Sequence, residues 1–79
     1  MSLDLKEIKV EGIVSRSGGR YTITTDDGTQ YELFAILPWE SVAPDYGTRV
    51  FARFIGKRVM ATGLTEGHTI WKTQLITVN

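Results

Sequence analysis

Three runs of alternating apolar and polar residues, separated by two glycine-bearing turns, occupy the stretch from Ile8 to Leu37. Alternation with a period of two is typical of a strand with one buried face, because successive side chains point to opposite sides. The turns contain Gly18-Gly19 and Asp27-Gly28, dipeptides that suit tight hairpins. The stretch therefore predicts three consecutive strands, at residues 7–14, 20–25 and 30–37. The rest of the chain must close this meander.

Gly12 interrupts the first of these strands on the side that carries Ile8, Val10 and Val14. A glycine inside a strand commonly marks a bulge or a bend, and we attribute this one to backbone dihedrals that a Cβ disfavours. We therefore expect the first strand to bend at Gly12 and to serve two sides of a barrel.

Pro38 ends the third predicted strand, and Pro44 and Gly47 exclude a long helix from the irregular segment that follows. Beyond this segment lie four apolar residues at the spacing of one helical face: Val50, Phe51, Phe54 and Ile55. This stripe predicts a helix of about two turns, and Gly56 suits its C-terminal end. A strand over the same run is the alternative, because short apolar runs fit both structures.

Alternation resumes at residues 57–63 and again at residues 68–78, on either side of a loop that contains Gly67. These two runs predict a closing hairpin. In the second run Ile70 and Ile76 share one side, whereas Trp71 and Leu75 lie on the other. We therefore expect a bulge in the last strand, or burial of both its faces.

The composition predicts one small globular domain over residues 1–79, with residues 1–6 frayed. The hydrophobic share of 42% and the charged share of 23% are typical of folded chains. Nine basic residues balance nine acidic ones, so the chain lacks the positive charge of a protein that binds phosphates tightly. The absence of cysteine and the single histidine exclude disulfides, thiolate chemistry and His-rich metal sites.

No run approaches the roughly 20 apolar residues that span a bilayer. Lys6 and Glu7 interrupt the apolar residues near the N-terminus, which therefore differ from the core of a signal peptide. We expect a soluble, cytoplasmic protein with no membrane partner.

The order of three strands, a short helix and a two-stranded hairpin resembles that of the OB-fold, a five-stranded Greek-key barrel. The resemblance covers essentially the whole chain. It includes the bent first strand KVEGIVSR, the two turns and the tail GKRVMATG…IWKTQLITV, which is similar to the ending of many small OB domains. The chain resembles small stand-alone bacterial OB-fold proteins of uncharacterised function.

This resemblance implies a mainly all-β fold with one short helix between strands 3 and 4. An SH3-like five-stranded barrel is the alternative fold. Such barrels usually have a single helical turn at this position, so a helix of about two turns favours the OB-fold.

The resemblance also implies a ligand surface across the second and third strands, flanked by the loops between strands 1 and 2 and between strands 4 and 5. The candidate residues on that surface are Arg16, Arg20, Tyr21 (or Thr22), Tyr31, His68, Trp71 and Lys72. Aromatic side chains stack on bases, and basic side chains beside them meet phosphates. The leading functional hypothesis is weak binding of single-stranded DNA or RNA.

Competing interpretations apply to these residues. Tyr21 and Tyr31 share the parity of Ile23 and Leu33, which favours the core for both rings. Burial and exposure both remain open for Trp71, with burial slightly favoured. Three carboxylates in the same meander would repel a phosphate backbone: Asp26, Asp27 and Glu32.

Trp39 lies in the irregular segment, near Leu37, Val42 and Tyr46 in sequence. It either plugs one end of the barrel beside the helix or forms part of an apolar contact patch. Plugging is the favoured interpretation in so small a core. A contact patch would support a protein partner or self-association, which is the alternative to nucleic-acid binding.

Catalysis has the least support. His68 has no cysteine partner, and its nearest acid, Glu66, lies in the same loop. Asp26-Asp27 adjoins Gly28, an arrangement that turn chemistry explains better than metal binding. The glycines match neither a phosphate-binding loop nor a dinucleotide fingerprint. We therefore predict a non-enzymatic binding module without a metal or cofactor.

Overall fold

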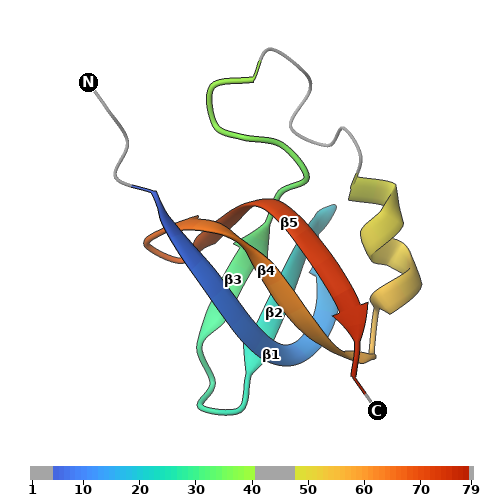
Figure 1. Ribbon diagram of the computed structural model, residues 1–79. Helices are drawn as coiled ribbons and strands as arrows, with labels where there is room; N and C mark the ends of the chain where they lie inside the picture. The colour runs from blue at the N-terminus through green and yellow to red at the C-terminus, as the bar shows by residue number, and fades with distance from the viewer. Residues whose placement is uncertain (1–4, 41–47, 79) are drawn as a thin grey trace.

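The computed structural model describes residues 5–40 and 48–78. These residues form five strands and one short helix (Figure 1). The elements are β1 (Lys6–Ser17), β2 (Arg20–Thr25), β3 (Gln30–Leu33), the 3₁₀-helix η1 (Thr48–Phe54), β4 (Arg58–Glu66) and β5 (Thr69–Thr77). The predicted mainly-β structure with a short helix between the third and fourth strands is confirmed, and the alternative strand at the helix position is wrong.

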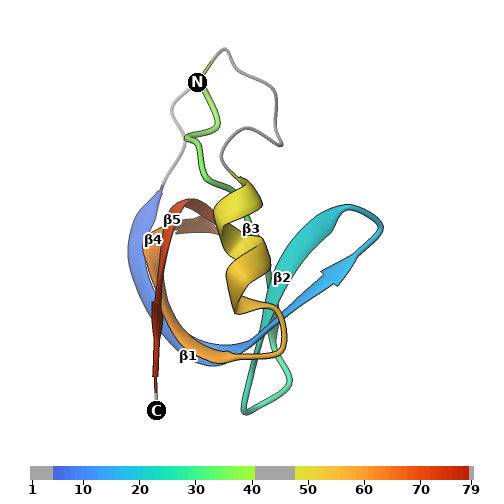
Figure 2. The same ribbon diagram turned by 90° about the vertical axis from the view of Figure 1, so that its right-hand side faces the viewer.

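The strands pair in the order β1-β2-β3-β5-β4, and β4 pairs back with β1, so the sheet closes into a ring. β3 and β5 are parallel neighbours, whereas the other neighbouring strands are antiparallel. Figure 2 shows the ring with η1 in front of its opening.

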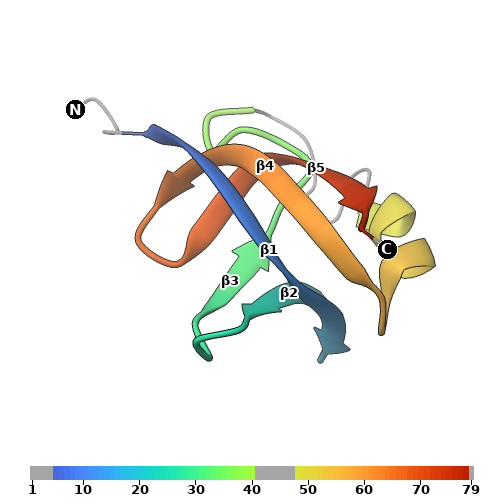
Figure 3. The ribbon, with the colours of Figure 1, turned by 60° about the horizontal axis from the view of Figure 1, so that its bottom comes forward.

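β1 bends and serves two sides of the ring, as predicted. Residues from Lys6 to Ile13 pair with β4, and those from Gly12 to Ser17 pair with β2; Figure 3 shows β1 crossing from one neighbour to the other. The predicted reason for the glycine is wrong, because Gly12 is not among the residues with positive φ. A Cβ at this position would instead lie 2.2 Å from the backbone oxygen of Thr24, so the close approach of β2 requires glycine.

The two hairpin turns of the meander are confirmed, and positive φ angles of 81° at Gly19 and 88° at Gly28 explain their glycines. β3, however, ends at Leu33 instead of Leu37. Beyond Leu33 the backbone leaves β2 and follows β5, where the Phe34 N–H donates to the Ile70 carbonyl at 2.9 Å and the Ile36 carbonyl accepts from Lys72 N–H at 2.9 Å.

The core fills the inside of the ring with side chains of the predicted inward parity. Its buried members are Val14, Tyr21, Ile23, Leu33, Phe51, Val59, Ala61 and Ile70. In η1, Phe51 is only 1% exposed and Phe54 packs against the core, whereas Val50 is 52% exposed, and Ile55, directly after the helix, is 44% exposed. The predicted four-residue stripe is therefore reduced to two residues, because a 3₁₀-helix has three residues per turn and places positions i and i+3 on one face.

The predicted bulge of the last strand is present where the register of β4 and β5 shifts between Thr62 and Leu64. Opposite this shift, Lys72 has a φ of 51°, a left-handed conformation that is uncommon for a residue with a Cβ.

Within residues 5–40 and 48–78, no helix is both long enough and apolar enough to cross a bilayer.

Candidate ligand-binding surface

The predicted surface across β2 and β3 has a polar outer face without an aromatic side chain. The inward-facing positions of these strands are occupied by core residues, namely Tyr21, Ile23 and Leu33. The outer positions form two cross-strand pairs, which are Thr22 with Glu32 and Thr24 with Gln30. This face can donate and accept hydrogen bonds, but it offers no ring on which a base could stack.

Tyr21 is a core residue, as its parity indicated, and is only 9% exposed. Its ring meets the ring of Phe51 edge-on, with centroids 5.8 Å apart, and the Arg16 guanidinium lies 5.8 Å from the Tyr21 centroid. Arg16 thus covers the outer end of the core at the β1–β2 hairpin. The Tyr21 ring is not available as a stacking platform.

Arg20 is exposed near the same hairpin, and its Nη1 lies 3.9 Å from Oε1 of Glu32. Glu32 is half-buried at the middle of the predicted surface, and its backbone N–H donates to the His68 carbonyl at 2.8 Å. The carboxylate of Glu32 therefore partly offsets the charge of Arg20. A phosphate at this position would meet a negative charge.

A second group of candidate residues lies where β3 runs beside β5. The rings of Tyr31 and His68 are 6.0 Å apart, and those of Phe34 and Trp71 are stacked at 4.6 Å with an interplanar angle of 15°. We call these four residues together with Lys72 the aromatic rim. Backbone bonds between β3 and β5 hold both ring pairs in register.

Burial differs among the members of the aromatic rim. His68 and Lys72 are exposed, and Tyr31 is half-buried, partly in line with its predicted core position. Trp71 is half-buried on Phe34, so neither full burial nor full exposure describes it. Phe34 is the rim residue that sequence reasoning missed. Its position in the alternation could have indicated it, because Phe34 follows Gln30 and Glu32 on the outer side of the strand.

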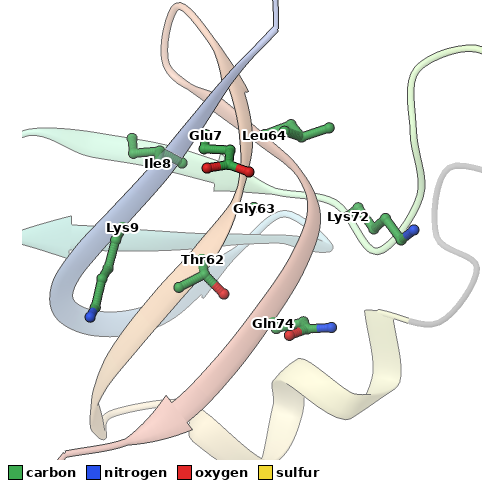
Figure 4. A pocket seen from close by; sticks show the side chains of 8 residues that line it. All are labelled: Glu7, Ile8, Lys9, Thr62, Gly63, Leu64, Lys72 and Gln74. Carbon is green, nitrogen blue, oxygen red and sulfur yellow. The ribbon is translucent and has the colours of Figure 1, made fainter.

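A shallow pocket of about 470 Å³ adjoins the rim through Leu64 and Lys72 on the outer side of β1, β4 and β5. In Figure 4, Thr62 lies in its middle, and the ammonium groups of Lys9 and Lys72 point to opposite sides. The two cations therefore do not converge on one anion.

Arg58 belongs to a structural ion-pair cluster away from the rim. Its Nε lies 2.5 Å from Oε2 of Glu11, and its Nη2 lies 2.6 Å from Oδ2 of Asp26. Hydrogen bonding to Arg58 and its positive charge lower the pKa of Asp26. The Thr25 hydroxyl, followed by the backbone and side chain of Thr29, lowers the pKa of Asp27. Both carboxylates stay charged and would repel a phosphate near the β2–β3 turn.

Trp39 does not plug the ring, because 63% of its surface is exposed. The favoured prediction is therefore wrong: Phe51 and Phe54 of η1 occupy the place that plugging would require. Val42 and Tyr46, its predicted neighbours, lie outside the described residues. Among the residues that the structure describes, no group of three or more His, Cys, Asp or Glu side chains is placed to hold a metal ion.

No family model matches this chain, and comparisons with curated proteins and with solved structures found no match.

Proposed function

We propose that this protein is a non-enzymatic OB-fold binding module that binds single-stranded nucleic acid weakly at the aromatic rim. Two features support the fold assignment. The strand order β1-β2-β3-β5-β4 with a bent first strand is that of a five-stranded Greek-key ring. The seven-residue helix between β3 and β4 is longer than the single turn expected of an SH3-like barrel.

The observation that carries the functional proposal is the stacked pair of Phe34 and Trp71 beside the exposed Lys72, with the Tyr31–His68 pair close by where β3 meets β5. An aromatic ring stacks on any base, and each such contact contributes about 1–3 kcal/mol. Lys72 supplies a cation for the phosphate that follows the stacked base. His68 is exposed at the β4–β5 turn and contributes a further ring, which pairs with Tyr31.

The binding is weak because few cations accompany the rings. Arg20 faces Glu32, and Arg58 is held by Glu11 and Asp26, so neither supplies an unopposed positive charge. Each neutralised phosphate contributes a slope of about −0.7 to the dependence of log affinity on log salt for single strands. We expect a slope close to the value for one or two phosphates.

The test uses Trp71 as its own reporter. The chain has two tryptophans, and Trp39→Phe removes the one outside the rim. We expect the fluorescence of this variant to change on titration with mixed-sequence single-stranded DNA and RNA, more strongly at about 50 mM than at about 200 mM salt.

Two further substitutions in the Trp39→Phe background separate the roles within the rim. His68→Ala removes a stacking ring and should weaken binding at every salt concentration, whereas Lys72→Gln should mainly flatten the salt dependence. Lys6→Gln removes a cation at the start of β1 and is the matched control. It should change neither the affinity for the oligonucleotide nor the salt dependence of that affinity.

An unchanged fluorescence and thermal midpoint at saturating oligonucleotide would contradict nucleic-acid binding. The alternative, a protein-contact module, would then take its place. The observation that favours this alternative is the 63% exposure of Trp39.

A further inference from the structure

The charges of this neutral chain are divided between its two parts. Residues 1–47 hold eight of the nine acidic residues but four of the nine basic ones. Residues 48–79 hold five basic residues and a single acidic one, Glu66. The zero net charge therefore conceals a positive C-terminal part, which begins at η1.

Three of these five cations lie on or directly after η1. Arg49, Arg53 and Lys57 are exposed. In the described part of the chain, the ion pairs engage Arg20 and Arg58 and none of these three. The side chains of these three residues are exposed, whereas Arg58 is half-buried in its ion-pair cluster.

Exposed aliphatic side chains accompany these cations. On η1 and at its end, Val50 and Ile55 are 52% and 44% exposed, and on β5 Ile76 is 64% exposed. η1 contacts β5 and lies beside its C-terminal half (Figures 1 and 3). We define the η1–β5 flank by these residues: Arg49, Val50, Arg53, Ile55, Lys57 and Ile76.

Single exposed aliphatic residues are common on protein surfaces and need no explanation. On this flank, however, Val50 and Ile55 lie between the three cations in sequence, Ile76 lies on the neighbouring strand, and none of the six flank residues is acidic. Such a surface complements a partner that supplies both carboxylates and apolar side chains.

The chemistry of the flank disfavours other anionic partners. Its apolar members are β-branched aliphatic chains, which provide no π-face for a nucleic-acid base. Helices that lie on membranes usually have a long apolar face with Trp, Phe or Leu, whereas η1 has seven residues and presents its two phenylalanines to the core.

We infer that the η1–β5 flank binds an acidic amphipathic segment of a partner protein. The cations attract and orient the acidic side chains of that segment, and Val50, Ile55 and Ile76 bury its apolar ones. This surface is separate from the aromatic rim, so the inference does not depend on nucleic-acid binding.

The test measures fluorescence anisotropy of a labelled synthetic peptide that alternates Glu with Leu. A Gln–Leu peptide lacks the charge, and a Glu–Ser peptide lacks the apolar side chains. We expect the full-length protein to bind the Glu–Leu peptide at least about tenfold more tightly than either control, a difference of about 1.4 kcal/mol.

Substitutions then locate the binding site. Arg53→Glu should weaken binding of the Glu–Leu peptide about tenfold or more, and Lys6→Glu, the same charge reversal on β1, should be close to wild type. Val50→Ser should weaken binding, and Ile13→Ser is its matched control at an exposed position of β1. His68→Ala, in the aromatic rim, should have no effect.

Three outcomes of the peptide experiments would overturn the inference. The Glu–Ser peptide could bind as tightly as the Glu–Leu peptide, or Lys6→Glu could lose as much affinity for the Glu–Leu peptide as Arg53→Glu does. The third is that single-stranded DNA displaces the peptide from the wild type but not from His68→Ala. Binding of the wild type but not of Arg53→Glu to vesicles of neutral and anionic phospholipid would assign the flank to membranes. A dimer in light scattering that Arg53→Glu dissociates would assign it to a second copy of the chain.

Discussion

Two residues without side chains allow the strands of this small ring to approach one another. A Cβ at Gly12 would lie 2.2 Å from the backbone oxygen of Thr24, and one at Gly63 would lie 2.5 Å from that of Trp71. Neither obstacle is a flexible side-chain end, so the backbone itself would have to move. Gly12 lies at the bend of β1 and Gly63 at the bulge between β4 and β5, which are the places where the sheet curves.

Gly12→Ala should therefore destabilise the fold by about 1–3 kcal/mol or more, the usual cost of overpacking. Chemical denaturation monitored by circular dichroism measures this difference. Gly19→Asn is the control, because asparagine tolerates the left-handed conformation of that turn. A Gly12→Ala midpoint equal to that of the control would show that β1 can bend without the close approach.

At the scale of elements, the short helix and the last strand each contribute both to the core and to the proposed binding surfaces. η1 inserts Phe51 into the core and presents Val50 to solvent, one residue away. β3 and β5 are parallel neighbours at Glu32–Thr69 and Leu33–Ile70, and further backbone bonds from Phe34 to β5 help to position the aromatic rim. The bulge at Lys72 lies next to Trp71 in the chain and brings the Lys72 side chain to the pocket that adjoins the rim.

The face of η1 can be tested with two adjacent substitutions. Phe51→Ala should cost about 3–5 kcal/mol, because it leaves a cavity in a small core. Val50→Ala should change stability by no more than about 0.5 kcal/mol, as is usual for exposed positions. Thermal or urea unfolding distinguishes the two, and similar losses would mean that η1 packs with both side chains.

At the scale of the whole molecule, Arg58 joins three segments that are distant in sequence. It lies at the start of β4 and holds Glu11 of β1 and Asp26 of the β2–β3 turn. The pKa of Asp26 is lower in the folded protein than its ordinary value of 3.8. This carboxylate therefore contributes stability above that value and loses the contribution as pH falls through its folded pKa.

Thermal melts from about pH 7 to about pH 2 should show this loss in the wild type. In Arg58→Met, the decrease below the ordinary pKa of Asp26 should be shallower, because the ion pair that lowers this pKa is gone. Some decrease should remain, since the pKa of Asp27 is lowered by Thr25 independently of Arg58. Equal decreases in both proteins would exclude Arg58 as the cause.

Local residue patterns were sufficient for most of the strand assignments. A period of two is a property of neighbouring residues, so the inward positions of Val14, Tyr21 and Ile23 follow from the chain itself. The hairpin turns and the bend at Gly12 are equally local. The parity of Tyr21 also correctly favoured the core over a ligand surface.

Contacts between distant residues determined the rest. β3 ends early because Phe34 and Ile36 form backbone hydrogen bonds with Ile70 and Lys72 of β5, each 36 residues further along the chain. A parallel pair such as β3 and β5 needs a long connection of this kind. The closure of the ring around a small core also determined three further features. These are the 3₁₀ geometry of η1, the exposure of Trp39 and the stacking of Phe34 on Trp71. Alternation along a strand indicates which face is buried, but it carries no information about which distant strand will cover it.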